Sequence, residues 1–298
     1  MSENNGHNNP HVESTAEFTD LKLSKPETYE AGKEAVLVSA EHVLKAMNPV
    51  RGFKALNQLN QYDGFDCPSC AWPDPDDDRS SIAEYCENGA KAISEEATTK
   101  VIWEDFFALH SVEQLSKLDD YHIGKSGRIG RPMYLPENGT HYEPISWENA
   151  FKKIAEKLNG LNSPDEAIFY NSGRTSNEAA YLYQLFIREF GTNNMADCNN
   201  LCHKSSAIAL EDTVGSAKGS TTLQDLYEAE VIMIVGQNPG TNHPRMLSAL
   251  KKARENDALI IAVNPLKEAG LQNFTDPQSI AGILGREIKI SNYYLQIR

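Results

Sequence analysis

The sequence has no apolar run that could cross a membrane. Runs such as Val231–Val235 are far shorter than the roughly 20 residues that a spanning helix needs. The first residues, Met1–His7, carry no basic stretch, no apolar core and no twin-arginine pair, so the features of an export signal are missing. We therefore expect a cytoplasmic protein without a membrane span.

Positive charge is also scarce. The 298 residues include 28 lysines and arginines against 42 aspartates and glutamates, which gives a net charge of -14. Such a surface repels phosphate backbones and anionic lipids, so we expect no nucleic-acid partner and no binding to a membrane surface. The length suits one large or two ordinary domains.

Cysteine is rare as well, with five residues in the whole chain: Cys67, Cys70, Cys86, Cys198 and Cys202. Structural disulfides are uncommon in the cytoplasm, so these thiols are better explained by metal or redox chemistry. Internal repeats with a period of 20–50 residues are missing too, which excludes a solenoid or a propeller.

The hydrophobic pattern predicts three regions. Residues 1–50 form a polar tail and lead-in, residues 51–145 form a loop-rich region with three of the cysteines, and residues 146–298 form an α/β domain. In the last region, expected strands alternate with expected helices, which is typical of a parallel sheet with right-handed crossovers. The expected strands are Ala167–Tyr170, a short one near Met195, Val231–Val235 and Leu259–Val263, and the helices are Asn177–Phe190, His203–Thr213 and Pro244–Asn256.

Two further segments have a helical pattern. Ser81–Ala97 places apolar side chains on one stripe and contains Cys86 and Lys91. The last residues, Asn292–Arg298, also have a helix-like pattern, without a cap. Because the pattern stops there abruptly, we expect the chain to be truncated within a larger fold.

The first candidate site is a proline-rich loop with a C-x2-C motif, Cys67 and Cys70, followed by Cys86. Prolines prevent regular structure there, so the loop holds two thiols three residues apart, a spacing that suits one metal ion or cluster. Asp74 stands where a C-x2-C-x3-C motif has its third cysteine, and a carboxylate can replace a thiolate on iron. A zinc site, a thioredoxin-like redox pair and inert buried cysteines are the alternatives.

The second candidate is the dipeptide Cys202-His203, which we expect at the start of a helix. A thiol at a helix start is favoured as thiolate, and an imidazole beside it can transfer protons near neutral pH. This pair suits a soft-metal ligand, or a nucleophile with its own acid–base partner. A buried free cysteine is the simpler alternative, and packing is the expected role of Cys198.

The third candidate is the loop Gly236–Pro244, which follows an apolar strand and begins a helix. Backbone N–H groups in such a loop can bind an anion such as phosphate. The dinucleotide motif G-x-G-x-x-G is absent, and a loop without any ligand is the alternative. Ligands of parallel sheets bind beyond the carboxyl ends of the strands, where we expect Arg174, Gln237, Asn238 and Asn264.

Together these segments resemble the molybdopterin oxidoreductase superfamily, most closely its formate dehydrogenase alpha-subunit-like branch. The resemblance covers roughly residues 50–298 and rests on several short segments rather than on any one of them. They are Gly64–Pro75, Cys86–Lys91, Gly173–Ala180, Gly191–Asn194, Cys198–His203, Gly236–Pro244 and Asn264–Pro265.

The resemblance implies an iron–sulfur region followed by an αβα domain that binds a molybdenum bis-molybdopterin guanine dinucleotide. A [4Fe-4S] cluster would be held by Cys67, Cys70, Cys86 and the residue at position 74. Catalysis would involve Cys202 as a molybdenum ligand, His203 in proton transfer and Lys91 between cluster and pterin. The residues implied to bind the pterin cofactor are Arg174, Gly236, Gln237, Asn238, Pro239, His243 and Asn264.

Three departures limit what the resemblance implies. Asp74 replaces the third cluster cysteine, and Asn199-Asn200 stand where formate dehydrogenases usually have Ala-Arg, so formate need not be the substrate. Relatives also continue for several hundred residues more.

We expect an oxidoreductase with a small-molecule substrate and an unidentified electron-transfer partner. The alternatives are an inactive iron–sulfur or pterin-binding module and a zinc-binding interaction domain.

Overall fold

The computed structural model describes residues 25–70, 72–76, 79–80 and 83–297 and divides them between two compact units. One unit contains Thr99–Phe151, and the other contains Glu27–Thr98 together with the chain from Lys152 onward. Our three expected regions, with boundaries at 50 and 145, stay predictions. Of the expected tail and lead-in, residues 1–24 lie outside the described residues, and residues 25–50 are described.

The first unit consists of short elements. Strand β2 (Val101–Ile102) pairs in parallel with β3 (Arg128–Ile129), and β4 (Met133–Tyr134) pairs antiparallel with β5 (Glu143–Pro144). The short helices are α5 (Glu104–Leu109), α6 (Val112–Leu115) and α7 (Asp120–Ser126). Ser111 caps α6 in a capping box with Gln114, which explains why so short a helix forms here.

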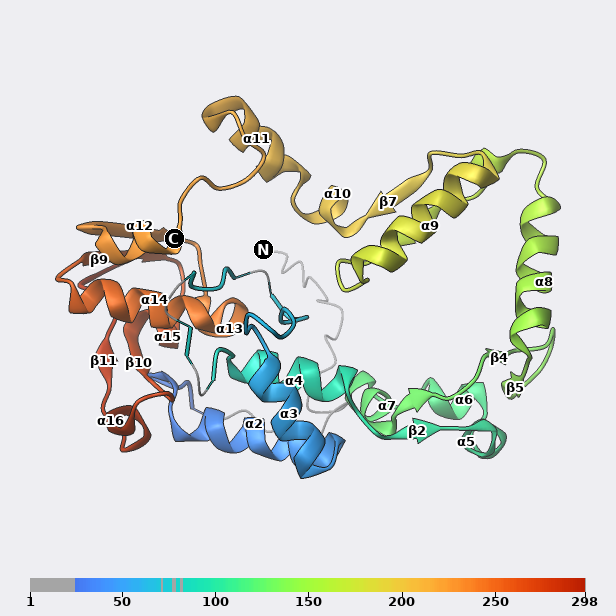
Figure 1. Cartoon of the computed structure of the whole chain (residues 1–298), viewed down its shortest axis with the longest axis horizontal. Helices are drawn as coiled ribbons and strands as arrows, with labels where there is room; N and C mark the ends of the chain where they lie inside the picture. Colours follow the sequence, from blue (N-terminus) through green and yellow to red (C-terminus); the bar gives the residue numbers. More distant parts are fainter. Residues whose placement is uncertain (1–24, 71, 77–78, 81–82, 298) are drawn as a thin grey trace, which may run out of the picture. The chain divides into compact units, whose positions relative to one another are not determined.

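The second unit is built on a three-stranded sheet with the order β12-β9-β8. The strands are β8 (Val231–Val235), β9 (Leu259–Asn264) and β12 (Tyr293–Gln296), and all their pairings are parallel. Side chains alternate along β8 and β9, and one face packs on helix α14 (Pro244–Glu255). The central strand, β9, lies beside this helix (Figure 1). Leu247 and Leu250 of α14 are fully buried in this core, and each contributes about 1.5–3 kcal/mol of hydrophobic stabilisation.

Three helices pack on one another ahead of this sheet in the chain: α2 (Lys33–Ala46), α3 (Pro49–Gln58) and α4 (Glu87–Glu96). Between α3 and α4 lies the cysteine loop. Expected helix Ser81–Ala97 is correct only in its second half, because residues 83–86 are extended and α4 begins at Glu87. The Cys86 sulfur caps the helix by accepting the Gly89 N–H, which fixes the helix start there. Ser81 and Ile82 lie outside the described residues.

The segment from α8 to α11 contains a second, separate parallel pair. Strand β6 (Phe169–Asn171) pairs with β7 (Met195–Asp197) and not with the three-stranded sheet. The described residues therefore do not form the one continuous sheet that the pattern suggested. The helices of this segment are α8 (Trp147–Asn159), α9 (Asn177–Phe190), α10 (Cys198–Cys202) and α11 (Lys204–Val214). Helix α9 has the expected bounds, with Ser176 as its N-cap and the left-handed Gly191 at its end.

The remaining elements complete the second unit. They are β1 (Glu30–Ala31), β10 (Asn273–Thr275) and β11 (Ile288–Lys289), which form one small sheet, and the helices α12 (Leu223–Glu228), α13 (Pro239–Asn242), α15 (Ala269–Gln272) and α16 (Ile280–Ile283). The helix-like prediction for Asn292–Arg298 is wrong, because Tyr293–Gln296 pair with β9 as a strand. Within the described part of the chain, no helix has both the length and the apolar character to span a membrane.

Candidate metal and cofactor site

Three cysteine side chains lie near one another at the start of α4. Cys86 is the N-cap of the helix, and a Cβ atom placed on Gly89 would lie 3.1 Å from the Cys67 sulfur. The Cys67 thiol also accepts hydrogen bonds from the backbone N–H groups of Ser69 and Cys70. The structure therefore makes Cys67, Cys70 and Cys86 neighbours at the start of α4.

Burial favours the protonated form of the Cys67 and Cys86 thiols when no metal is bound. It raises the pKa of Cys67 and the pKa of Cys86, and the neighbouring cysteines raise both pKa values further. Hydrogen bonds from backbone N–H groups act in the opposite direction but do not outweigh burial. Because metals bind thiolates, loading this site has to release protons, and metal affinity should rise with pH.

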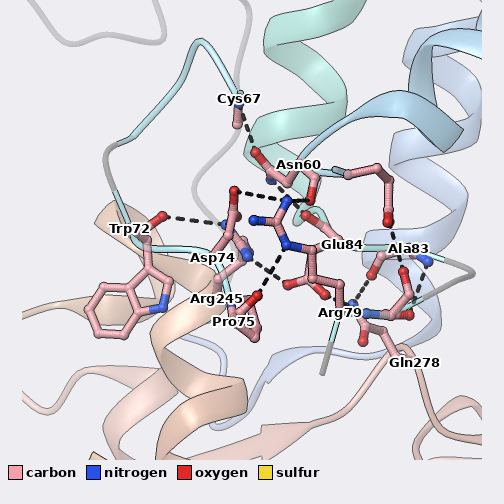
Figure 2. A network of polar contacts seen from close by, with 12 residues as sticks. Asn60, Cys67, Trp72, Asp74, Pro75, Arg79, Ala83, Glu84, Arg245 and Gln278 are labelled. Carbon is pink, nitrogen blue, oxygen red and sulfur yellow. Dashed lines mark hydrogen bonds and ion pairs between the residues drawn. The ribbon is translucent and has the colours of Figure 1, made fainter. Parts of the chain in front are cut away.

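Asn60 connects the two parts of the cysteine site (Figure 2). Its side-chain oxygen accepts the Cys67 N–H at 2.8 Å, and its side-chain nitrogen donates to the Glu84 carbonyl at 2.7 Å. Asn60 is only 2% exposed and has φ +59°, a left-handed conformation that asparagine tolerates better than most residues. Asn60 thus fixes the loop that bears Cys67 against the segment that leads to Cys86.

We expect Asn60→Ala to destabilise the protein and to weaken the binding of iron, if iron occupies the cysteine site. The substitution leaves the Cys67 N–H and the Glu84 carbonyl without their partner, at a cost of about 1–3 kcal/mol for each buried group. Urea titration and iron analysis measure the two effects, and Asn57→Ala, an exposed position on α3, is the matched control. Asn60→Gly relieves the strain of the left-handed backbone, but it lacks the same two hydrogen bonds, so it should also lose iron. Wild-type iron content in both Asn60 variants would contradict the positioning role.

A buried ion-pair network holds the cysteine loop against α14 (Figure 2). Arg245 lies with Nη1 at 2.7 Å from Asp74 Oδ1 and with Nη2 at 2.6 Å from Glu84 Oε1, and all three side chains are at most 16% exposed. Burial disfavours the charged form of Arg245, but the two carboxylates outweigh it, so the pKa of Arg245 is raised. Arg245 also donates to the Trp72 carbonyl at 3.4 Å. Asp74, our expected cluster ligand, thus has an arginine as its partner in this structure.

The Gly236–Pro244 loop lies at the carboxyl end of β8, as expected, and contacts the start of α4. Asn88 on α4 donates to the Thr241 carbonyl at 2.8 Å, and the rings of Trp72 and His243 have their centroids 6.3 Å apart. The cysteine loop, α4 and the Gly236–Pro244 loop therefore form one neighbourhood, although Asn88 and Thr241 are 153 residues apart in sequence.

Two asparagines, Asn238 in this loop and Asn264 at the end of β9, form hydrogen bonds within the chain itself. Asn264 is buried, donates to the Gln237 carbonyl at 2.9 Å and accepts the Leu266 N–H. Asn238 caps α13 by accepting the Thr241 N–H and donates to Glu268 at 2.7 Å. Pro239 is fully buried, whereas Gly236, with φ +68°, and Gln237 are exposed. Gly236 and Gln237 are thus open to solvent, and Asn238 and Asn264 shape the loop that bears them.

Glu30 packs its carboxylate against this loop. A Cβ atom on Gly240 would lie 2.5 Å from Glu30 Oε2, so a larger residue at position 240 would require the Glu30 side chain to move. Burial raises the pKa of Glu30, and the charges of Glu87 and Glu268 raise it further. The carboxylate therefore carries an electrostatic cost when it is ionised.

We expect Glu30→Gln to stabilise the protein at neutral pH. Since the pKa of Glu30 is raised above its ordinary value of 4.5, the folded state binds the proton more tightly, and wild-type stability falls as pH rises through this interval. The glutamine variant lacks this loss, so its thermal midpoint should exceed that of the wild type at pH 7 and match it below pH 4.5. Glu34→Gln, at an exposed position of α2, should leave both values unchanged. An equal gain at both pH values would contradict the electrostatic explanation.

Lys91 and Arg174 both lie on the cysteine side of the second unit. Lys91 forms an ion pair with Glu87 one turn earlier on α4. Arg174 follows β6 and pairs with Glu96 at 3.3 Å, at the end of α4. A cavity of about 970 Å³ is lined by Arg174, Glu96, Cys67 and Cys70. The structure therefore associates Arg174 with the cysteine loop rather than with the Gly236–Pro244 loop.

Cys202 and His203 occupy a different position from the one that we expected. Cys202 is the last residue of α10, and His203 is the N-cap of α11, so the thiol does not lie at a helix start. The expected helix His203–Thr213 is present as α11, within one residue at each end, and the short helix α10 before it was not expected. Both side chains are exposed. Cys198 packs instead, with its sulfur 2.9 Å from where a Cβ atom on Gly173 would lie.

Sequence patterns did not identify the residues that hold the cysteine loop: Asn60, Arg79, Glu84 and Arg245. Of these, Arg79 donates to the Asn60 carbonyl at 2.9 Å and lies over the Tyr62 ring at 4.0 Å. One feature of the sequence could have indicated them. A loop with three prolines has no regular structure, so its backbone groups need side-chain partners, and the surrounding sequence is strongly polar.

The spacing of the ligands bears on which metal fits. Among the described residues, no three His, Cys, Asp or Glu side chains lie close enough to share a single metal ion. A structural zinc ion needs four such ligands around one point. An iron–sulfur cluster binds its thiolates on several irons, so its ligands do not have to converge on one point.

Comparison with known proteins gives consistent matches. The family described as "Molybdopterin oxidoreductase" matches residues 128–282, just over half of the chain. An uncharacterised oxidoreductase of Mycobacterium tuberculosis is 55% identical over 268 residues, and protein YdeP of Escherichia coli is 41% identical over 278 residues. These matches cover 90% and 92% of this chain but only 34% and 36% of the relatives. Formate dehydrogenase H of Escherichia coli is 32% identical over 145 residues, which cover 47% of this chain and 20% of that protein.

Proposed function

The chain belongs to the molybdopterin oxidoreductase family, and on that premise we propose that it is the cluster- and pterin-binding part of a molybdenum-dependent oxidoreductase. The proposed cofactors are a molybdenum bis-molybdopterin guanine dinucleotide and a [4Fe-4S] cluster. One contact carries the proposal: the α4 helix that begins at Cys86 is hydrogen-bonded to the Gly236–Pro244 loop. An electron-transfer cluster and a pterin have to lie close together, and this contact joins the two candidate sites.

The thiols supply the proposed iron–sulfur site. Cys67, Cys70 and Cys86 would each bind one iron of the cluster, and Asn60 keeps the two short segments that bear them in register. Soft thiolates are suitable ligands for iron, and burial of the site lowers its exposure to water. Lys91 would lie between cluster and pterin, one helical turn beyond Cys86.

The residues of the proposed pterin site have different roles. The exposed backbone at Gly236 and Gln237 would bind the dinucleotide, with His243 near the end of the same loop and Pro239 buried within it. Asn238 and Asn264 orient the loop through their hydrogen bonds within the chain. Arg174 is a cation that would face the cofactor from the cysteine side.

Molybdenum chemistry would depend on the Cys202-His203 pair. The bound metal supplies the two-electron oxidation or reduction of a small substrate. Cys202 would ligate it, and the imidazole of His203 would transfer the substrate proton, since both side chains are exposed. Asn199 and Asn200 stand before this pair, so the substrate is a small molecule that need not be formate. A cytoplasmic location and an external electron-transfer partner complete the proposal.

Metal analysis tests the proposal. Protein purified without oxygen should contain molybdenum and about four irons per chain, and its visible absorbance should bleach on reduction. Protein that contains neither molybdenum nor iron would contradict the function, and stoichiometric zinc in a colourless protein would support the interaction domain instead.

A further inference from the structure

The cysteine loop contains three thiols for a cluster of four irons. Cys67, Cys70 and Cys86 lie together at the start of α4, and the fourth position of the motif is Asp74. Asp74 could act as a ligand only if its carboxylate were available to iron. The side-chain contacts of Asp74 therefore decide how many irons the protein can bind directly.

The Asp74 carboxylate is bound by two arginines. Arg245 Nη1 lies 2.7 Å from its Oδ1 atom, and Arg79 Nη1 lies 3.9 Å from its Oδ2 atom. Asp74 is 16% exposed, and Arg245 is 11% exposed. A buried guanidinium that loses one of its two carboxylates is left partly unpaired, which is strongly unfavourable. The ion pair therefore opposes a turn of Asp74 toward the thiols.

Arg245 has the geometry of a fixed partner for Asp74. It comes from α14, whose other face is packed into the core, and its second nitrogen binds Glu84 at 2.6 Å. Its contact with the Trp72 carbonyl places it against the backbone of the same loop. The loop conformation around Asp74 is thus set by α14.

We infer that Asp74 is an anchor for Arg245 rather than a cluster ligand, so that one iron of the cluster has no protein ligand and binds a small external one. This inference rests on the proposed iron–sulfur site. The chemical class of the external ligand is a small oxygen or sulfur donor, such as hydroxide, a carboxylate or a thiolate. The cavity of about 970 Å³ beside Cys67 and Cys70 has room for it.

An iron without a protein ligand is lost more easily than the other three. Mild oxidation by ferricyanide takes one electron from the cluster and releases one Fe²⁺, so that [4Fe-4S]²⁺ becomes [3Fe-4S]⁺. We expect the anaerobically purified protein to release one Fe²⁺ per cluster and to show the EPR signal of a three-iron cluster. Addition of Fe²⁺ and a reductant should reverse the change. With ⁵⁷Fe²⁺ in that step, Mössbauer spectra should show a single labelled site that shifts when 2-mercaptoethanol is added.

The variant Asp74→Asn separates the two roles of Asp74. Asparagine retains the shape of the side chain and an oxygen that can accept from Arg245, but it is a poor ligand for iron. We expect it to retain the iron count and the EPR and Mössbauer spectra of the wild type, whereas Cys70→Ala should lose them. A change of the labelled iron site in Asp74→Asn would show that Asp74 ligates iron and would overturn the inference.

Ferricyanide oxidation of the wild-type protein also tests, without any variant, whether one iron lacks a protein ligand. A cluster that keeps all four irons under ferricyanide and does not respond to the thiol would overturn the inference, while the proposed function would stand. A protein without iron would contradict the proposed function itself.

Discussion

Arg245→Met is expected to lower the free energy of unfolding by about 3–5 kcal/mol, because it leaves the Asp74 and Glu84 carboxylates buried without their cation. The same substitution releases the cysteine loop from α14, so the protein should also lose most of its iron. Urea titration of the metal-free protein measures the first effect, and iron analysis after anaerobic purification measures the second.

Two comparisons make this test specific. Arg286→Met is also an arginine-to-methionine substitution, at an exposed position of the same unit, and should change the free energy of unfolding by less than about 0.5 kcal/mol. The triple variant Arg245→Met, Asp74→Asn, Glu84→Gln removes both unpaired charges and should recover much of the lost stability. If the triple variant is as unstable as Arg245→Met alone, loss of packing rather than unpaired charge explains the effect.

Cys202→Ala is expected to remove one sulfur ligand from molybdenum and to reduce turnover by more than about 100-fold. Changes to groups that only support a metal ligand already cost 10–100-fold, so loss of the ligand itself should cost more. The number of sulfur neighbours in molybdenum X-ray absorption spectra should fall by one, independently of the substrate. Turnover is followed as the reduction of benzyl viologen when the protein oxidises its substrate. The visible absorbance of the iron–sulfur cluster should remain.

The neighbouring cysteine is the control for this prediction. Cys198→Ala makes the same change at the other end of α10, where the sulfur packs against Gly173. It should leave the molybdenum spectrum as it is in the wild type. An unchanged sulfur count in Cys202→Ala, or an equal decrease in both variants, would remove Cys202 from its proposed role.

Elements with strong and long patterns could be predicted from the sequence. A continuous apolar run predicted β8 with its observed bounds, and a helical stripe with Ser176 and Gly191 at its ends predicted α9. Short segments could not be predicted in this way, because a few apolar residues fit a helix and a strand equally well. Tyr293–Gln296 became a strand because β9 offers it an open edge, which is a tertiary effect.

The candidate site shows a similar division. The spacing of Cys67 and Cys70 and the position of the Gly236–Pro244 loop after an apolar strand were visible in the sequence. The partners of the loop were not, because Arg245 and Glu84 are 161 residues apart and no local pattern links them. Asn60 was also missed, since its importance depends on a left-handed backbone and on burial, which only the folded chain creates.

Gly89 makes the first turn of α4 a reporter of iron loading. Its N–H group donates to the Cys86 sulfur at 3.4 Å, and its Cα faces the Cys67 sulfur. A thiolate held by iron is a stronger and better-fixed acceptor than a mobile thiol, so amide hydrogen exchange at Gly89 should slow when the cluster is inserted. The supply of iron would then determine when this turn becomes resistant to proteolysis in a newly synthesised chain.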